Sequence, residues 1–74
     1  MAELGAMKPH EIRAILLRAG YRVVRQKGSH MRLEAKGRQA LTLALHTREV
    51  SPGMAKKILM TDAGLTDEEV ERLR

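Results

Sequence analysis

Hydrophobic positions recur with a helical period near the start of the chain and with a strand period in its middle. Between Pro9 and Ala19 the apolar residues fall at i, i+3, i+4 and i+7, which predicts a helix with one apolar face. Gly20 then stands where a helix commonly ends. Residues 21–27, 30–36 and 39–45 are rich in β-branched residues or alternate between apolar and polar side chains, so each run is predicted to be a strand.

The helical period returns after the third strand. Ser51 and Pro52 suit the N-cap and the first position of a helix that is predicted to continue to Ala63. The apolar stripe expected along this helix consists of Met54, Ala55, Ile58 and Leu59. Thr66 to Glu69 has the T-x-x-E pattern of a capping box, which predicts a short final helix from Asp67 to about Leu73.

The order of these elements predicts an α+β fold. A helix, three antiparallel strands in a meander and a second helix bury their apolar stripes most economically when both helices pack on one face of the sheet. The other face of the sheet is then exposed to solvent. Residues 1–6 carry no periodic pattern and are expected to be a flexible extension, and residues 7–74 a single domain.

Composition and charge narrow the choice of partners. The 74 residues have a net charge of +5, and between Arg22 and Arg48 only Glu34 opposes seven cations, so the predicted sheet carries the positive potential. Such a surface favours nucleic acid or an acidic protein. The absence of cysteine and of a long apolar run is typical of a soluble cytoplasmic protein without a membrane span.

The candidate catalytic and phosphate-binding residues lie at the corner between the first two predicted strands. Gly28 and Ser29 are predicted to form a tight hairpin turn, with His30 directly after it. Arg25, Lys27 and Arg32 surround this histidine in the sequence and would hold a phosphate close to its ring. By the alternation of the strands, His30 and His46 both project from the exposed face, at a distance that the sequence does not give.

Several kinds of catalytic site are excluded. The chain has no cysteine nucleophile, no phosphate-binding glycine loop and no H-E-x-x-H motif, and two histidines without a third ligand do not make a metal site. RNA cleavage by proton transfer remains, because RNA carries its own nucleophile, the 2′-hydroxyl, and one histidine can move the proton at neutral pH. From these residues alone, the interpretation to be preferred is a histidine that is merely exposed, because a histidine at a hairpin corner more often has no catalytic role.

A resemblance to a known family adds to this interpretation. The chain from Met7 to about Val70 resembles the HicA family of mRNA interferase toxins, and Gly28-Ser29-His30 is the most specific part of the match. The family commonly ends its third strand with Val-Pro-x-His, whereas this chain has Leu43-Ala44-Leu45-His46. The other matching stretches are Lys8-Pro9, Gly20-Tyr21, Arg25-Gln26-Lys27, Arg48-Glu49-Val50, Pro52-Gly53, Ile58-Leu59 and Ala63-Gly64-Leu65.

The resemblance implies a fold similar to double-stranded RNA-binding domains, cleavage of messenger RNA without a cofactor, and silencing by a HicB-like antitoxin. The catalytic histidine that it implies is His30. A single-histidine acid/base mechanism needs no metal ion. The residues expected to contact RNA are Arg25, Lys27, Ser29, Arg32, Lys36, Arg38 and His46.

Two other functions remain open on the sequence. A domain of this fold can bind RNA without cutting it, and a basic face can instead meet an acidic protein. Tyr21 is the only aromatic residue and is expected in the core, so little base preference is expected from stacking.

Overall fold

The computed structural model describes residues 5–46 and 48–74, and it has the predicted order of helix, three antiparallel strands and helices. The strands form one sheet in the order β1-β2-β3. The α+β prediction is therefore confirmed. The elements are α1 (Pro9–Arg18), β1 (Arg22–Lys27), β2 (His30–Glu34), β3 (Leu41–Ala44), α2 (Pro52–Lys56), the π-helix η1 (Lys57–Asp62) and α3 (Asp67–Leu73).

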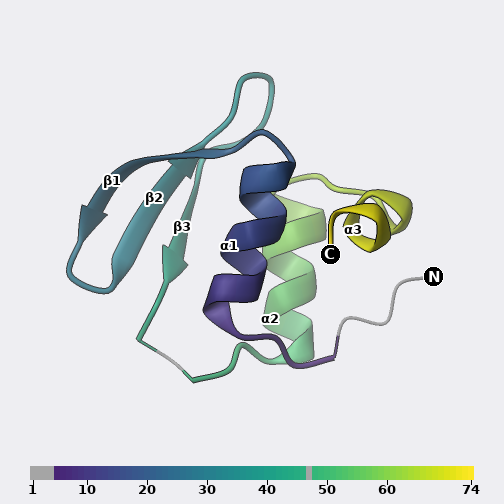
Figure 1. Cartoon of the computed structure of the whole chain (residues 1–74), viewed down its shortest axis with the longest axis horizontal. Helices are drawn as coiled ribbons and strands as arrows, with labels where there is room; N and C mark the ends of the chain where they lie inside the picture. Colours follow the sequence, from purple (N-terminus) through teal and green to yellow (C-terminus); the bar gives the residue numbers. More distant parts are fainter. Residues whose placement is uncertain (1–4, 47) are drawn as a thin grey trace.

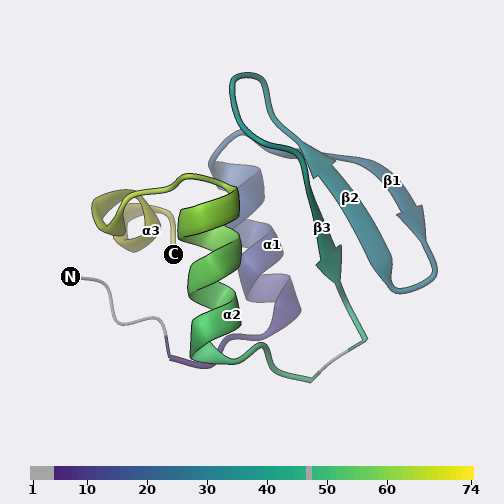
Figure 2. The ribbon, with the colours of Figure 1, turned by 180° about the vertical axis from the view of Figure 1, so that it is seen from behind.

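The sheet forms one layer, and α1 and α2 lie together against one of its faces (Figure 1). α3 lies on the side of these helices that points away from the sheet, and β1 is the strand farthest from them in both views (Figure 2). Met31 and Leu33 of β2 and Leu41 and Leu43 of β3 are buried, while their neighbours along each strand point outward. We call the solvent-exposed side of the sheet the outer face.

One continuous core joins the two layers. Its members share exposures of 9% or less, and its largest fully buried side chains are Ile12, Ile15, Leu16, Leu33, Leu43, Leu59 and Val70. Tyr21 is buried as predicted, and its hydroxyl donates a hydrogen bond of 2.6 Å to the carbonyl of Gln39. Burial raises the pKa of the Tyr21 phenol, so this donor stays protonated in neutral solution.

The strands are shorter than predicted because the end of α1 and the turn after β2 use residues that were expected in strands. The amide of Tyr21 donates to the carbonyl of Leu16 and that of Gly20 to Leu17, which together make a Schellman motif around Gly20 at φ 105°. Tyr21 therefore ends the helix rather than beginning β1. At the same end of the sheet, the amide of Arg38 donates to the carbonyl of Ala35, and β2 stops at Glu34, opposite Arg22.

The second helix differs most from the prediction. It begins at Pro52 with Ser51 as N-cap, as expected, but continues as a π-helix from Lys57, where the amide of Ala63 donates to the carbonyl of Ile58. The expected apolar stripe is wrong at Met54, which is 49% exposed. Ala55, Ile58 and Leu59 are buried as predicted.

Met7 is the first buried residue of the described chain. Its side chain is buried, and its backbone pairs with Val50 through two hydrogen bonds, of 3.0 and 2.6 Å. This bridge fastens the start of the chain to the segment before α2. Of the expected flexible extension, residues 1–4 lie outside the described residues, and Gly5 and Ala6 are exposed.

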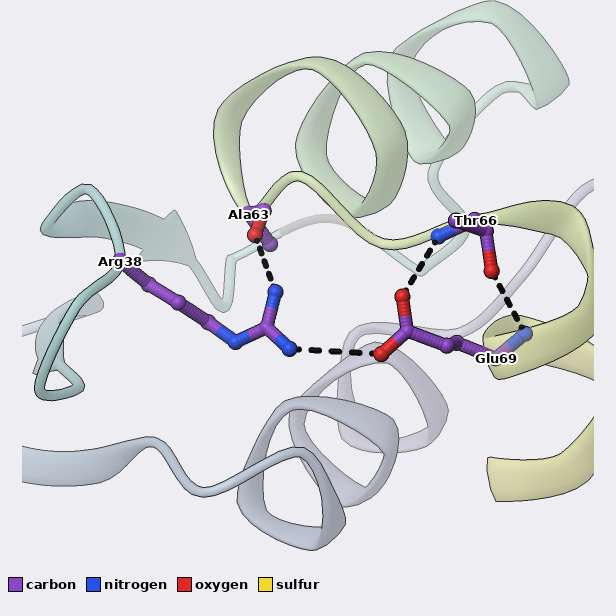
Figure 3. Close-up of polar contacts among 4 residues, drawn as sticks. All are labelled: Arg38, Ala63, Thr66 and Glu69. Carbon is purple, nitrogen blue, oxygen red and sulfur yellow. Dashed lines mark hydrogen bonds and ion pairs between the residues drawn. The ribbon is translucent and has the colours of Figure 1, made fainter.

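A network of polar contacts fastens α3 to the sheet (Figure 3). Thr66 and Glu69 form the predicted capping box: Thr66 Oγ1 accepts from the amide of Glu69, and Glu69 Oε1 accepts from the amide of Thr66. Arg38, in the turn after β2, donates to the carbonyl of Ala63 at 3.0 Å and to Glu69 Oε2 at 3.3 Å. Arg38 thus joins the loop between β2 and β3 to the end of η1 and to α3.

We expect the stability that Glu69 contributes to depend on pH. The backbone hydrogen bond from Thr66, followed by the charge of Arg38, lowers the pKa of the Glu69 carboxyl. A lowered folded-state pKa adds stability above the unfolded-state value of about 4.3, and this is lost as the pH falls through the folded-state value. Urea denaturation should show Glu69→Gln destabilised at pH 7 and less so in acid. The exposed Glu49→Gln is the control, and an equal effect of Glu69→Gln at both pH values would contradict the prediction.

Candidate functional site

The hairpin corner is built as the sequence predicts. β1 ends at Lys27 and β2 begins at His30, and these two residues face each other in the antiparallel ladder. Gly28 has a φ of 58°, a left-handed conformation that glycine adopts without steric cost, which allows the turn to span only two residues. His30 therefore stands at the first position of a paired strand, with its side chain exposed.

The ladder places cations beside this histidine on the outer face. Residues that pair across two antiparallel strands point to the same side, so Lys27 shares the outer face with His30, and Arg25 shares it with Arg32. Arg22 faces Glu34 farther along the same two strands. All of these side chains are exposed.

A bulge in β1 makes this arrangement possible. The register shifts between Val23 and Arg25, so Val24 is an extra residue without a partner opposite it. Strict alternation would put Arg22 and Arg25 on opposite faces, because they are three residues apart. With the bulge, both lie on the outer face together with Lys27.

The cations leave a place for an anion. Arg25 and Arg32 lie directly opposite each other, and like charges in that position destabilise a sheet. None of the ion pairs among the described residues includes Arg25, Lys27 or Arg32. An open cavity of about 750 Å³ lies over them, and its lining comprises Arg25, Lys27, Gly28, Ser29, His30, Arg32, Glu34 and Thr42. A phosphate there would offset the repulsion between the two guanidinium groups.

The second histidine of the outer face comes close to the first. The centroids of the His30 and His46 rings are 6.1 Å apart, with an angle of 59° between the ring planes. Both rings lie on the outer face, as the alternation of the strands predicted. Both imidazoles are exposed.

Two of the expected RNA contacts lie elsewhere. Lys36 follows the end of β2, about 20 Å along the chain from His30 at the usual rise of a strand, and lines a separate depression with Arg22 and Gly20. Arg38 is held by Ala63 and Glu69. The structure brings Arg25, Lys27, Ser29 and Arg32 together around His30, and these two residues do not join them.

The lining of the cavity also includes residues that are not among those expected to act in catalysis or to bind RNA. Thr42 lies opposite Arg32 on β3, and Glu34 follows Arg32 on the outer face of β2. The alternation of β3 could have identified Thr42, since it has the same parity as His46. The position of Arg22 on the outer face, outside this cavity, could be predicted only with knowledge of the bulge, which the sequence does not provide.

Comparison with protein-family models identifies the family to which a chain with this site belongs. The model for the HicA toxin of bacterial toxin–antitoxin systems matches residues 9–65, which include the hairpin corner and both outer-face histidines. The chain belongs to the HicA toxin family. A search of curated proteins found no match.

Membership makes this HicA protein the toxin component of a toxin–antitoxin system and implies a HicB-type antitoxin as its partner. The resemblance noted in the sequence is thereby confirmed. The match ends before α3, so the Glu69 end of the Arg38 network lies beyond it.

Two further features of the described residues of this HicA protein concern membranes and metals. In the described part of the chain, no helix has both the length and the apolar character to span a bilayer. Over the same residues, no three side chains of histidine, aspartate or glutamate gather as metal ligands.

Proposed function

We propose that this toxin is an endoribonuclease that cleaves messenger RNA, with His30 transferring a proton at the scissile phosphate and no metal ion taking part. The observation that carries the proposal is the position of His30, exposed in an open cavity whose walls hold Arg25, Lys27 and Arg32. The activity belongs where messenger RNA is found, in the cytoplasm.

The chemistry requires little of the protein. Once the 2′-hydroxyl loses its proton, its oxygen attacks the adjacent phosphorus, and the bond to the 5′-oxygen breaks. Histidine has an ordinary pKa near 6.5 and can take up or release the proton, which contributes about a hundred- to ten-thousand-fold to the rate. Arg25, Lys27 and Arg32 stabilise the extra negative charge of the transition state, and the Ser29 hydroxyl donates to a phosphate oxygen.

RNA binding in this proposal is dominated by phosphate contacts. The arginine and lysine side chains of the cavity neutralise the backbone near the cleaved bond, and Lys36 reaches a more distant phosphate. Arg38 is left out, because its guanidinium is already used by Ala63 and Glu69. The burial of Tyr21 removes the one aromatic side chain from any stacking role.

The same face is the proposed binding site of the HicB-type antitoxin. An acidic antitoxin surface would offset the repulsion between Arg25 and Arg32 as a phosphate does, so antitoxin and RNA would compete. Coexpression with the neighbouring open reading frame should then relieve toxicity.

Cleavage in the presence of a chelator tests the proposal. We expect the purified protein to cut RNA in excess EDTA and to leave 2′,3′-cyclic phosphate and 5′-hydroxyl ends, since the nucleophile is the ribose itself. The ends can be assigned by mass spectrometry of a short oligonucleotide. Retention of intact RNA with strongly salt-dependent binding would instead indicate a non-catalytic RNA-binding domain.

A further inference from the structure

We propose that His46 is a second catalytic residue, which works with His30 so that one imidazole removes the 2′ proton while the other protonates the leaving 5′-oxygen. The inference rests on the proposed function. It changes the proposed mechanism from a single histidine to a pair with complementary roles.

Backbone contacts hold the segments that carry the two histidines side by side. His30 pairs with Ala44 across the β2–β3 ladder, and the amide of Leu45 donates to the carbonyl of Ser29 at 2.7 Å. His30 begins β2, whereas His46 lies two residues past the end of β3, in the segment that this hydrogen bond holds beside the hairpin turn. The two histidines are 16 positions apart in sequence, yet their ring centroids are 6.1 Å apart.

That separation suits a phosphodiester between the rings. Among the hydrogen bonds of the described residues, none joins His30 to His46, and both side chains are open to solvent. A catalytic hydrogen bond spans about 2.6–3.2 Å, so two imidazoles at this distance can each reach an oxygen of one phosphate. The cations of the cavity, Arg25, Lys27 and Arg32, belong to β1 and β2 and lie on that side of His30.

The proton balance of the step supports a pair. One neutral imidazole accepts the proton of the 2′-hydroxyl as the 2′-oxygen forms its bond to phosphorus. As the bond from phosphorus to the 5′-oxygen breaks, the other imidazole, in its protonated form, gives that oxygen a proton. The products are a 2′,3′-cyclic phosphate and a 5′-hydroxyl, no water is consumed, and both histidines return to their starting states by exchange with solvent.

A sulfur substitution in the substrate separates catalysis by His46 from simple phosphate binding. In an RNA whose leaving 5′-oxygen is replaced by sulfur, the thiolate leaves without needing a proton, so the enzyme no longer requires its general acid. Single-turnover cleavage of this RNA and of ordinary RNA should be measured for wild type, His30→Ala and His46→Ala. His10→Ala is the matched control, because His10 is exposed on α1 and outside the cavity.

On ordinary RNA we expect His46→Ala to lose about a hundred- to ten-thousand-fold in rate, and His10→Ala to keep the wild-type rate. On the sulfur-substituted RNA, the variant that lacks the general acid should regain most of its loss and the other variant should not. Circular dichroism should be unchanged, since both side chains lie outside the core.

The outcomes distinguish a failure of the histidine pair from a failure of the proposed endoribonuclease function. Wild-type cleavage by His46→Ala, a loss confined to KM, or recovery of neither variant on the sulfur-substituted RNA would overturn the pairing and leave His30 in place. Undiminished cleavage by His30→Ala would overturn the proposed function itself, and the pairing with it.

Discussion

Replacing His30 by alanine should lower RNA cleavage by at least about a hundredfold and leave the fold intact. The side chain is exposed at the start of β2, and its removal opens no cavity in the core. The ladder contacts of residue 30 with Lys27 and Ala44 are made by the backbone, so alanine keeps them. The measurement is the initial cleavage rate, with the circular dichroism spectrum recorded on the same sample.

Two controls sharpen this experiment. His30→Gln keeps a polar side chain that can hydrogen-bond to phosphate but cannot transfer a proton at neutral pH, so it should be as inactive as the alanine variant while still binding RNA. His10→Ala removes the one histidine that lies on a helix and should change nothing. If His30→Gln cut RNA at the wild-type rate, the acid/base role would be wrong.

The largest expected effect on stability is at Leu43. This side chain is 1% exposed, lies opposite Met31 in the ladder and belongs to the core that joins the sheet to the helices. Leu43→Ala should cost about 2–5 kcal/mol, from lost burial and the cavity left behind. Folded domains are stable by only about 5–15 kcal/mol, and a domain of 74 residues is expected near the lower limit. The Leu43→Ala variant should therefore be partly unfolded at 37 °C.

Leu17 on α1 is the matched control for Leu43, because it is a leucine that is 44% exposed. Leu17→Ala should change the free energy of unfolding by about 0.5 kcal/mol or less. Urea denaturation followed by circular dichroism measures both variants. Similar losses at the two positions would mean that the sheet is not packed on the helices as described.

The features that could be predicted from sequence are those with local causes. The turn at Gly28, the N-cap at Ser51 and the capping box of Thr66 each depend on a few adjacent residues, and all three are present. The alternation along β2 and β3 follows from burial on one side, and it gave the shared face of His30 and His46.

The features that could not be predicted depend on contacts distant in sequence. The distance between His30 and His46 is set by the offset of β2 and β3, which no local pattern records. Arg38 had the same appearance in sequence as the cations of the cavity, but Glu69, 31 residues away, determines its conformation. The π-helix from Lys57 to Asp62 has no signal in the apolar period, and neither does the exposure of Met54 in the turn of α2 before it.

Because Val24 has no partner in the ladder, β1 can change in length at this residue without a change in the direction of its other side chains. If Val24 were deleted, the remaining residues could pair as a regular strand, with Arg22 still opposite Glu34 and Arg25 still opposite Arg32. Deleting Gln26 instead would bring Arg25 opposite Met31 and so turn its side chain to the face of the sheet that packs on the helices. The strand next to the proposed active site can therefore gain or lose one residue at a single point without turning its arginines away from the substrate.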